Sequence, residues 1–324
     1  MEKIMEKIME QTGMKQIIEV IKKENITEYA ELIDYLVASE MQAEFETAIA
    51  NFAFWETYIK SNNRKTASIN SNNCKTQSSR NQYFTYSEAY SNAITGLTDL
   101  GRQQSELVVP EGVTSIGDKV FYRCSSLQSI ELPDGVTSIG REAFAHCESL
   151  KTINIPKGIT EINKGVFYNC SMLESITLPV TLKEISIRAF AGCENLKTIV
   201  IPEGVTTIGD NAFAHCEKVK SILLPNSISV IKKGAFNHCK ALTSVIFPDG
   251  VRKICEQAFY GCFSLEHIEF PTTLGSIQGQ AFARCRLLKH IIIPKSLWSL
   301  SGTSFYYCPN LELEVPARLV NDPD

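Results

Sequence analysis

One motif recurs through most of this 324-residue chain at a constant interval. The motif Phe-x-x-Cys occurs nine times, once every 23 residues, with its phenylalanine running from Phe121 to Phe305. A proline keeps the same interval from Pro110 to Pro294. Repetition at this length is typical of solenoids, in which one unit cannot bury its own apolar side chains and needs stacked neighbours. The interval therefore predicts that residues 106–316 form one stack of repeats.

Each repeat contains two short segments with strand character. Ile153 and Ile155 are two positions apart and therefore point to one face of a strand, so each repeat should give one strand to a parallel sheet. Pro156 should end that strand, because proline has no N–H and a fixed φ angle. Val205 and Ile208 then point inward from a second, shorter extended segment.

The remaining segment of the repeat, x-x-Ala-Phe-x-x-Cys, is long enough for about one or two helical turns with Ala, Phe and Cys inward. The glycines that follow the proline suit a turn residue with positive φ. The predicted fold is therefore an α/β solenoid, a curved array of about nine 23-residue repeats with a parallel concave sheet. These glycines are Gly112, Gly135, Gly158, Gly204 and Gly250.

The repeat is shown almost completely by PEGVTTIGDNAFAHCEKVKSI, residues 202–222. It resembles the 23-residue repeat of the BspA-like leucine-rich-repeat family over roughly two-thirds of the chain. The resemblance implies a leucine-rich-repeat array with an adhesin-like, protein-binding role, because members of that family are mostly surface or secreted binding proteins of bacteria and parasitic protists. It does not indicate the ligand, since the repeated positions face the core. The sequence departs from the family's glycine at Thr181, Ser227, Thr273 and Ser296.

Composition divides the rest of the chain into further parts. Residues 1–60 carry three apolar stripes at helical spacing, which predict a small all-α N-terminal module. Residues 61–83 are rich in Asn and Ser and predict a flexible polar linker. Residues 84–105 lack the Phe and Cys of the repeat and predict the N-terminal cap of a solenoid that spans 106–324 with a C-terminal cap. The stripes of the module fit a bundle core, or docking and self-association through Phe52, Phe54, Trp55 and Tyr58.

Eleven cysteines raise the question of disulfides. Nine of them occupy one position of the repeat, and a ladder with an odd number of thiols cannot pair completely. Equivalent sites on the helical side of successive coils should lie roughly 10 Å apart, beyond the ~7 Å reach of a disulfide. We therefore expect buried free thiols, with Cys74 in the linker as the exposed one. A zinc site is not expected, because zinc needs three or four ligands at one point.

Motifs that carry catalytic chemistry are missing from the sequence. It contains no GxxxxGK[ST] loop, no GxSxG, no HExxH and no CxxC. We therefore predict a non-enzymatic protein without a cofactor. His267 and His290 should face outward from adjacent strands about 5 Å apart, with Glu269 on the same face. Such residues suit a divalent metal, but on an open sheet they are more often solvated or touch a partner, so no metal is predicted.

The outward column of the predicted sheet changes from polar to apolar midway along the array. Three successive strands should place apolar side chains there at about 4.8 Å spacing, which indicates an interaction surface. The alternative is simple β-propensity on a partly shielded sheet. We predict a ligand-binding surface formed by Val200, Leu223, Ile246, His267, Glu269, His290 and Ile292.

Charge and hydropathy restrict the expected partners and compartment. The net charge is −4, no apolar run approaches the ~18 residues of a membrane helix, and the N-terminus lacks the apolar core of a secretory signal. We expect no membrane insertion, no nucleic-acid partner and a cytoplasmic location, or alternatively a surface or secreted location reached by a non-classical route. The predicted function is binding of a protein or peptide ligand on the concave sheet. The alternative is an intracellular scaffold or effector, whose helical module carries the activity while the repeats select the target.

Overall fold

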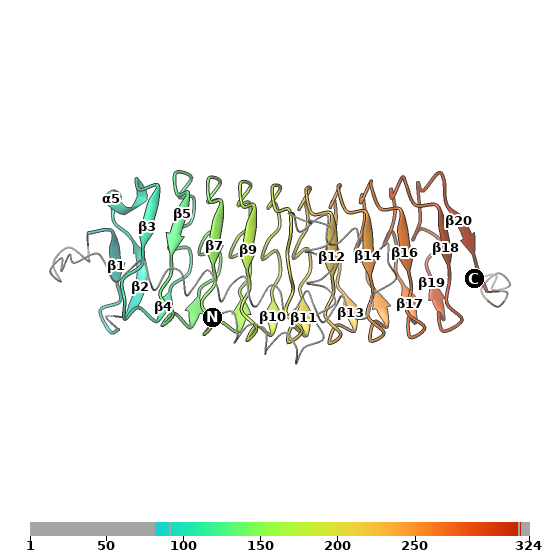
Figure 1. Cartoon of the computed structure of the whole chain (residues 1–324), viewed down its shortest axis with the longest axis horizontal. Coiled ribbons are helices and arrows are strands. Elements are labelled where there is room, and N and C mark those ends of the chain that lie inside the picture. The colour runs from blue at the N-terminus through green and yellow to red at the C-terminus, as the bar shows by residue number, and fades with distance from the viewer. Residues whose placement is uncertain (1–81, 91, 317, 319–324) are drawn as a thin grey trace, which may run out of the picture. The chain divides into compact units, whose positions relative to one another are not determined.

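The computed structural model describes residues 82–90, 92–316 and 318 (Figure 1). The chain divides into two compact units, Met1–Cys74 and Lys75–Asp324, and the described residues belong to the second. The predicted helical module lies outside the described residues, as does the predicted linker up to residue 81.

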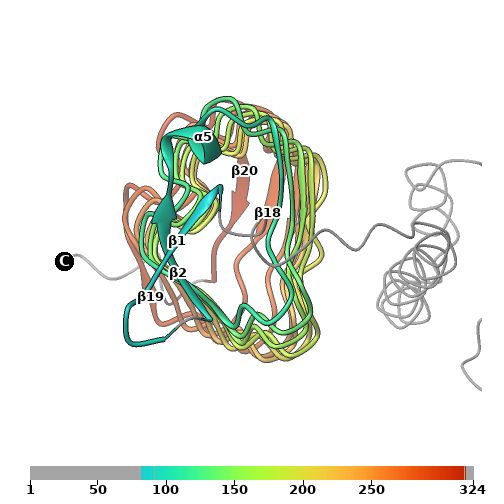
Figure 2. The ribbon, with the colours of Figure 1, turned by 90° about the vertical axis from the view of Figure 1, so that its left-hand side faces the viewer.

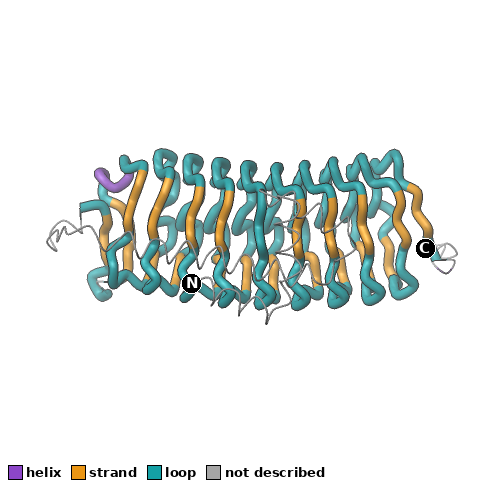
Figure 3. Tube along the Cα trace, in the orientation of Figure 1, coloured by secondary structure: helices purple, strands orange, loops and turns teal. Residues whose placement is uncertain are grey.

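The second unit is a β-solenoid of stacked coils, seen end-on in Figure 2, whose short strands form two rows (Figures 1 and 3). In one coil, the first row is continued by isolated bridges at Thr198 and Val200. The row of three-residue strands is the sheet that the sequence predicts to be concave, and we call it the long-strand sheet. Its strands are β3 (Glu106–Val108), β5 (Ser129–Glu131), β7 (Thr152–Asn154), β9 (Ser175–Thr177), β12 (Ser221–Leu223), β14 (Ser244–Ile246), β16 (His267–Glu269), β18 (His290–Ile292) and β20 (Glu312–Glu314).

The second row, the short-strand sheet, consists mainly of two-residue strands. It starts with an antiparallel pair, β1 (Phe84–Tyr86) and β2 (Ala93–Leu97), followed by the short helix α5 (Asp99–Arg102). The later strands pair in parallel. They are β4 (Ser115–Ile116), β6 (Ser138–Ile139), β8 (Glu161–Ile162), β10 (Glu184–Ile185), β11 (Thr207–Ile208), β13 (Val230–Ile231), β15 (Lys253–Ile254), β17 (Ser276–Ile277) and β19 (Ser299–Leu300).

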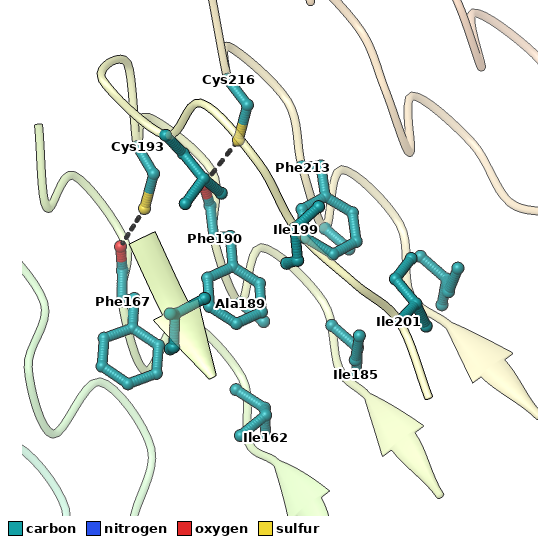
Figure 4. Close-up of a cluster of buried hydrophobic side chains, with 14 of the residues drawn as sticks. Ile162, Phe167, Ile185, Ala189, Phe190, Cys193, Ile199, Ile201, Phe213 and Cys216 are labelled. Atoms are coloured by element: carbon teal, nitrogen blue, oxygen red, sulfur yellow. Dashed lines mark hydrogen bonds between the residues drawn. The ribbon is translucent and has the colours of Figure 1, made fainter. Parts of the chain in front are cut away.

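A ladder of phenylalanine rings runs through the interior from Phe121 to Phe305. Centroids of neighbouring rings lie 4.7 to 5.6 Å apart, and their planes are within 16° of parallel. Phe167, Phe190 and Phe213 lie side by side among buried aliphatic side chains (Figure 4). Aromatic pairs contribute roughly 0.5–1.5 kcal/mol each beyond the area they bury, so the ladder links every repeat to its neighbours.

The Phe-x-x-Cys segment is a set of turns and not a helix, which corrects the predicted α/β class. Each of the first eight segments has two residues with left-handed φ, for example Glu142 at 55° and His146 at 61°, and the last has one, Tyr307 at 57°. A right-handed helix cannot continue through such residues. The backbone instead bonds to the next coil, as from Phe144 N–H to the Val166 carbonyl at 2.9 Å. In the described part of the chain no helix is long and apolar enough to cross a membrane.

The turns also correct the predicted spacing of the cysteines. Phenylalanine rings about 5 Å apart show that coils stack as closely on this side as strands do, so the expected ~10 Å separation is wrong. The cysteines of the described residues are free thiols. The Sγ of Cys193 donates to the Phe167 carbonyl at 3.2 Å, and the same bond recurs along the ladder (Figure 4). Burial raises the pKa of these thiols, to about 12 for Cys170 and Cys239.

The glycines after the proline differ from the prediction as well. Gly112 has a positive φ of 88°, but Gly158 does not, and there a Cβ would lie 2.9 Å from Thr137 Cγ2. At Gly112 and Gly135 a Cβ would meet no atom closer than 3.5 Å, so no single constraint selects glycine at this position in every repeat. Where Thr181 replaces it, the hydroxyl donates to the Lys157 carbonyl of the preceding coil at 2.7 Å. The predicted positive φ is likewise wrong for Gly135, Gly204 and Gly250.

Candidate binding surface

Side chains alternate between the core and solvent along the strands of the long-strand sheet from β3 to β18, whereas the terminal β20 is exposed throughout. Ile153 is 3% exposed and Ile222 is 3% exposed, whereas the outward Val108 and Ile292 remain 63% and 61% exposed. The alternation follows from the pleat, which sends neighbouring side chains to opposite faces. The inward and outward columns are therefore those that the sequence predicts.

Val200, Leu223 and Ile246 form a continuous row on the outward face, which we call the central apolar stripe. Val200 pairs with Leu223 through a parallel bridge, and Leu223 pairs with Ile246 in the ladder between β12 and β14. All three side chains are half-buried, and their inward neighbours are part of the core. Residues in direct register on adjacent strands have Cβ atoms roughly 5 Å apart, so the three side chains form one continuous patch.

Two of the flanking residues lie in the same sheet as the stripe. On β16, Glu269 is in register with Ile246, and His267 is in register with Ser244. Both flanking side chains are exposed. Pairing therefore places five of the seven predicted residues side by side, with the apolar stripe ending at an imidazole and a carboxylate.

His290 and Ile292 lie on the next strand, but β-pairing does not join them to the others. The strand β18 follows β16 in the row (Figure 1), yet within the described residues the ladder that contains β16 ends there. β18 pairs instead with β20, which sets His290 opposite Glu312 and Ile292 opposite Glu314. The predicted surface is thus divided between two sheet segments.

The imidazoles of this surface face different carboxylates. His290 Nε2 lies 2.9 Å from Glu314 Oε1, and His267 Nε2 lies 4.0 Å from Glu266 Oε2. Among residues 82–90, 92–316 and 318, no group of three or more His, Cys, Asp or Glu side chains is arranged to hold a metal ion. The sequence did not predict the pairing of His290 with Glu314, which lies across the ladder between β18 and β20.

The strands that carry the stripe have opposite charges beyond their two ends. Lys197 and Lys220 precede the outward positions, and Glu203 and Asp249 follow the prolines that end the strands; all four are exposed. Lys197 also lies 2.9 Å from Glu174, and its hydrogen bond and charge lower the pKa of that carboxyl group. Surface pairs of this kind add little stability, so their charges remain available to orient a ligand.

The fold and this open sheet define a repeat protein of the solenoid class. The chain matches the family described as BspA type Leucine rich repeat region over residues 101–220 and 206–319. It belongs to this BspA-type leucine-rich-repeat family, which confirms the resemblance seen in the sequence.

Solved structures of bacterial leucine-rich-repeat proteins are similar to this chain. One from Bacteroides ovatus is 35% identical, with a TM-score of 0.67 over 72% of this chain, and this chain spans 63% of its length. A leucine rich cell surface protein from Faecalibacterium prausnitzii is 26% identical, with a TM-score of 0.41, and coverage of 76% of this chain and 89% of that one. A leucine-rich-repeat protein of T. pallidum is 29% identical, with a TM-score of 0.43, and coverage of 64% and 88%. No curated protein matches the chain.

Proposed function

We propose that the long-strand sheet binds a protein or peptide ligand, with the central apolar stripe at the centre of the contact. The observation that supports this most strongly is the unbroken register of Val200, Leu223 and Ile246 on the outward face. Leucine-rich-repeat arrays are generally interaction modules rather than enzymes, which agrees with this use of the sheet. Adjacent apolar side chains on an otherwise polar face are typical of an interaction site.

Polar groups surround the stripe in a way that suits a polypeptide. Thr198, Ser221 and Ser244 form a hydroxyl row one pair of positions earlier on the same strands. Hydroxyl groups both donate and accept, so they match the N–H and C=O groups of a bound main chain. An apolar centre with a polar rim is the usual composition of a protein–protein contact.

Charge on the same face would fix the direction of the ligand. Lys220 lies on one side of the stripe, and Glu203 and Asp249 lie on the other. A ligand with an acidic and a basic end would therefore prefer one orientation across the strands. The exposed His267 and Glu269 extend the polar rim toward the C-terminal end of the array.

The test uses Ile246→Asp, which puts a charge in the middle of the stripe. Peptides selected from a random-peptide library on the intact chain should lose about 2 kcal/mol of binding free energy, roughly 30-fold in Kd, when the variant replaces the parent. The matched control is Thr177→Asp, because Thr177 lies in the same outward column but outside the stripe and is exposed. Isothermal titration calorimetry measures both affinities.

Two results would contradict the proposal. If the selected peptides bind Ile246→Asp as tightly as the parent, the ligand lies elsewhere on the molecule. If Thr177→Asp weakens binding as much as Ile246→Asp, the loss reflects general charge rather than the stripe. Circular dichroism of both variants should show the parent's fold, since an outward side chain contributes little to the stack.

The compartment of the protein is part of the same proposal. The location stays a prediction, either cytoplasmic or at the cell surface or secreted, and membership of the family favours the cell surface. Fractionation of cells that produce the native protein distinguishes an intracellular scaffold from a surface adhesin. The alternative role of the N-terminal module concerns residues outside the described part of the chain.

A further inference from the structure

A second surface lies on the turns rather than on the strands. In each Phe-x-x-Cys turn, the residue before the cysteine has a left-handed φ, as Arg284 does at 63° and Tyr307 at 57°. Its side chain and those of its neighbours form columns along the turn side of the coils. Three histidines lie in this column, His146, His215 and His238.

Rings and guanidinium groups stack continuously along the C-terminal half of this side. The imidazoles of His215 and His238 lie 4.7 Å apart with planes 9° from parallel, and Tyr260 follows 5.3 Å from His238. The guanidinium of Arg284 then lies 5.7 Å from the ring of Tyr260 and 5.7 Å from the ring of Tyr307. Each step of this stack connects one coil to the next.

A parallel branch of the stack carries a second guanidinium. Phe263 lies 6.3 Å from His238, and Arg286 lies 4.7 Å above the Phe263 ring. Arg284, Arg286 and Tyr307 line one shallow depression together with Pro309. We call Tyr260, Phe263, Arg284, Arg286 and Tyr307 the Arg–aromatic edge.

The rings hold both guanidinium groups in place without using their hydrogen-bond donors. A cation over an aromatic face contributes roughly 0.5–1 kcal/mol at an exposed site, which restricts the arginine rotamers before a ligand arrives. In the described part of the chain, neither Arg284 nor Arg286 forms an ion pair or a side-chain hydrogen bond, and both are exposed. Stacking on the rings does not require the guanidinium N–H donors to be exposed. Stabilisation of the turns therefore does not explain why these donors face solvent.

The local charge is opposite to that of the whole chain. The protein has a net charge of −4, yet the residues that line the depression carry two guanidinium groups and no carboxylate. Beside the stack, the Nζ of Lys240 forms an ion pair with the Oε1 of Glu217 at 2.6 Å. The field at the depression is therefore positive.

We propose that the Arg–aromatic edge binds an acidic segment of a partner protein. Guanidinium groups present forked N–H donors that match the two oxygens of a carboxylate, and both forks here are held by rings. The exposed face of Tyr307 offers a surface for the apolar atoms of the same segment. An open, shallow depression suits an extended peptide better than an enclosed small molecule.

This surface is separate from the central apolar stripe. The edge lies in the turns that lead from the short strands to the long strands, whereas the stripe lies on the strands themselves. The proposal does not rest on the proposed function of the long-strand sheet. Ile246→Asp should therefore leave binding at the edge unchanged.

The test uses a fluorescent oligoglutamate peptide as the probe and oligoglutamine as the neutral comparison, measured by fluorescence anisotropy with the intact chain at low salt. The parent should bind oligoglutamate and not oligoglutamine, and affinity should fall as salt rises. The double variant Arg284→Gln and Arg286→Gln should weaken oligoglutamate binding about tenfold or more. Gln280 has a φ of 58°, so glutamine tolerates the backbone conformation at position 284.

A matched control separates the site from the general loss of positive charge. Arg141→Gln with Arg188→Gln also removes two exposed arginines, and Arg188 has a left-handed φ of 56° as Arg284 does. This variant should bind oligoglutamate within about twofold of the parent, apart from weak long-range screening effects. The double variant Arg284→Lys and Arg286→Lys keeps the positive charge but loses the bidentate guanidinium donors. It should bind oligoglutamate with intermediate affinity.

Three outcomes would overturn the proposal. The parent does not bind oligoglutamate; or the control double variant loses as much affinity as the double variant at the edge; or oligoglutamine binds equally well. Binding of inorganic phosphate or a sulfated polysaccharide without binding of oligoglutamate would also reject an acidic peptide as the ligand. Circular dichroism of each variant confirms that the solenoid is folded, so a lost signal reports the surface.

Discussion

The central repeats and the last repeat have nearly the same sequence motif but different surroundings. Phe213 is buried between Phe190 at 5.2 Å and Phe236 at 5.6 Å, whereas Phe305 is half-buried and stacks on Phe282 at 5.5 Å. In the described residues the ladder contains no further phenylalanine beyond Phe305. A phenylalanine at this position therefore stabilises the fold more in a central repeat than in the last one, because in a solenoid each repeat contacts mainly its two neighbours.

The strands show the same contrast. Leu313, on β20, is 36% exposed, although its equivalent two coils earlier, Ile268, is 6% exposed. Cys308 is half-buried, whereas Cys193 is completely buried. Burial in this fold is thus a property of position in the stack as much as of position in the repeat.

The largest expected effect is the loss of a central ring. Phe213→Ala should lower the free energy of unfolding by about 3–5 kcal/mol, because it removes a buried aromatic side chain and leaves a cavity. Phe305→Ala should cost less than about half of that, since the ring is half-buried and has one stacked neighbour. Urea denaturation followed by circular dichroism measures both values.

Equal losses for the two variants would break the comparison. They would show that the array unfolds as a single cooperative unit in which the terminal repeat is as important as the centre. A Phe213→Ala change of under about 0.5 kcal/mol would place that ring outside the core.

A smaller effect is expected from the cysteine ladder. Cys193→Ala removes a buried sulfur and its hydrogen bond to the Phe167 carbonyl, and should cost about 1–2 kcal/mol. Cys308→Ala removes the equivalent bond to the Phe282 carbonyl at a half-buried site and should cost less. The same urea titrations measure both, and a larger loss at Cys308 would contradict the contrast between centre and end.

The smallest effect concerns pH and the stacked imidazoles. Burial lowers the pKa of His238, and so do the charges of His215, Lys240 and Arg284, while Glu217 acts in the opposite direction. The folded state therefore binds a proton at His238 less tightly than the unfolded chain does. Histidines of the unfolded chain titrate near pH 6.5. The free energy of unfolding should thus decrease as the pH falls through and below that value.

Replacement of His238 should make thermal stability less dependent on pH. Between about pH 7.5 and pH 5, the Tm of the parent should fall further than that of His238→Asn, by a small but measurable margin. Asparagine suits the left-handed φ, as Asn169 occupies the same column at 57°. His267→Asn, at an exposed position on β16, is the control and should behave like the parent. Identical profiles of Tm against pH for His238→Asn and the parent would show that the stacked imidazoles do not cause the pH dependence of stability.

The parallel sheet and its register could be predicted from particular residues. Apolar side chains two positions apart, such as Ile153 and Ile155, indicated which face of the strand is buried, and both are in the core. That register placed Val200, Leu223 and Ile246 on the outward face in advance. The division of the predicted surface between β16 and β18 could not be predicted, because nothing in the sequence of either strand marks a break in the pairing.

The Phe-x-x-Cys turns lie where the sequence predicts one or two turns of helix. Left-handed φ angles occur at residues such as Glu142 and Arg188, which carry no local signal for that conformation. They are stabilised by hydrogen bonds to the next coil, for example from Arg188 N–H to the Asp210 carbonyl at 3.0 Å. The segment is long enough for a helix, but the hydrogen bonds between stacked coils stabilise turns instead.

By itself, the sequence determined the repeat, the family, the inward columns and the place of the apolar stripe, because all of these follow from periodic burial of side chains. Only the tertiary structure decided the turn conformation, the pairing of His290 with Glu314, and the stack that holds Arg284 between Tyr260 and Tyr307. These features join residues about one repeat apart. Their geometry is set by the contact between coils, which the residues of one repeat do not specify alone.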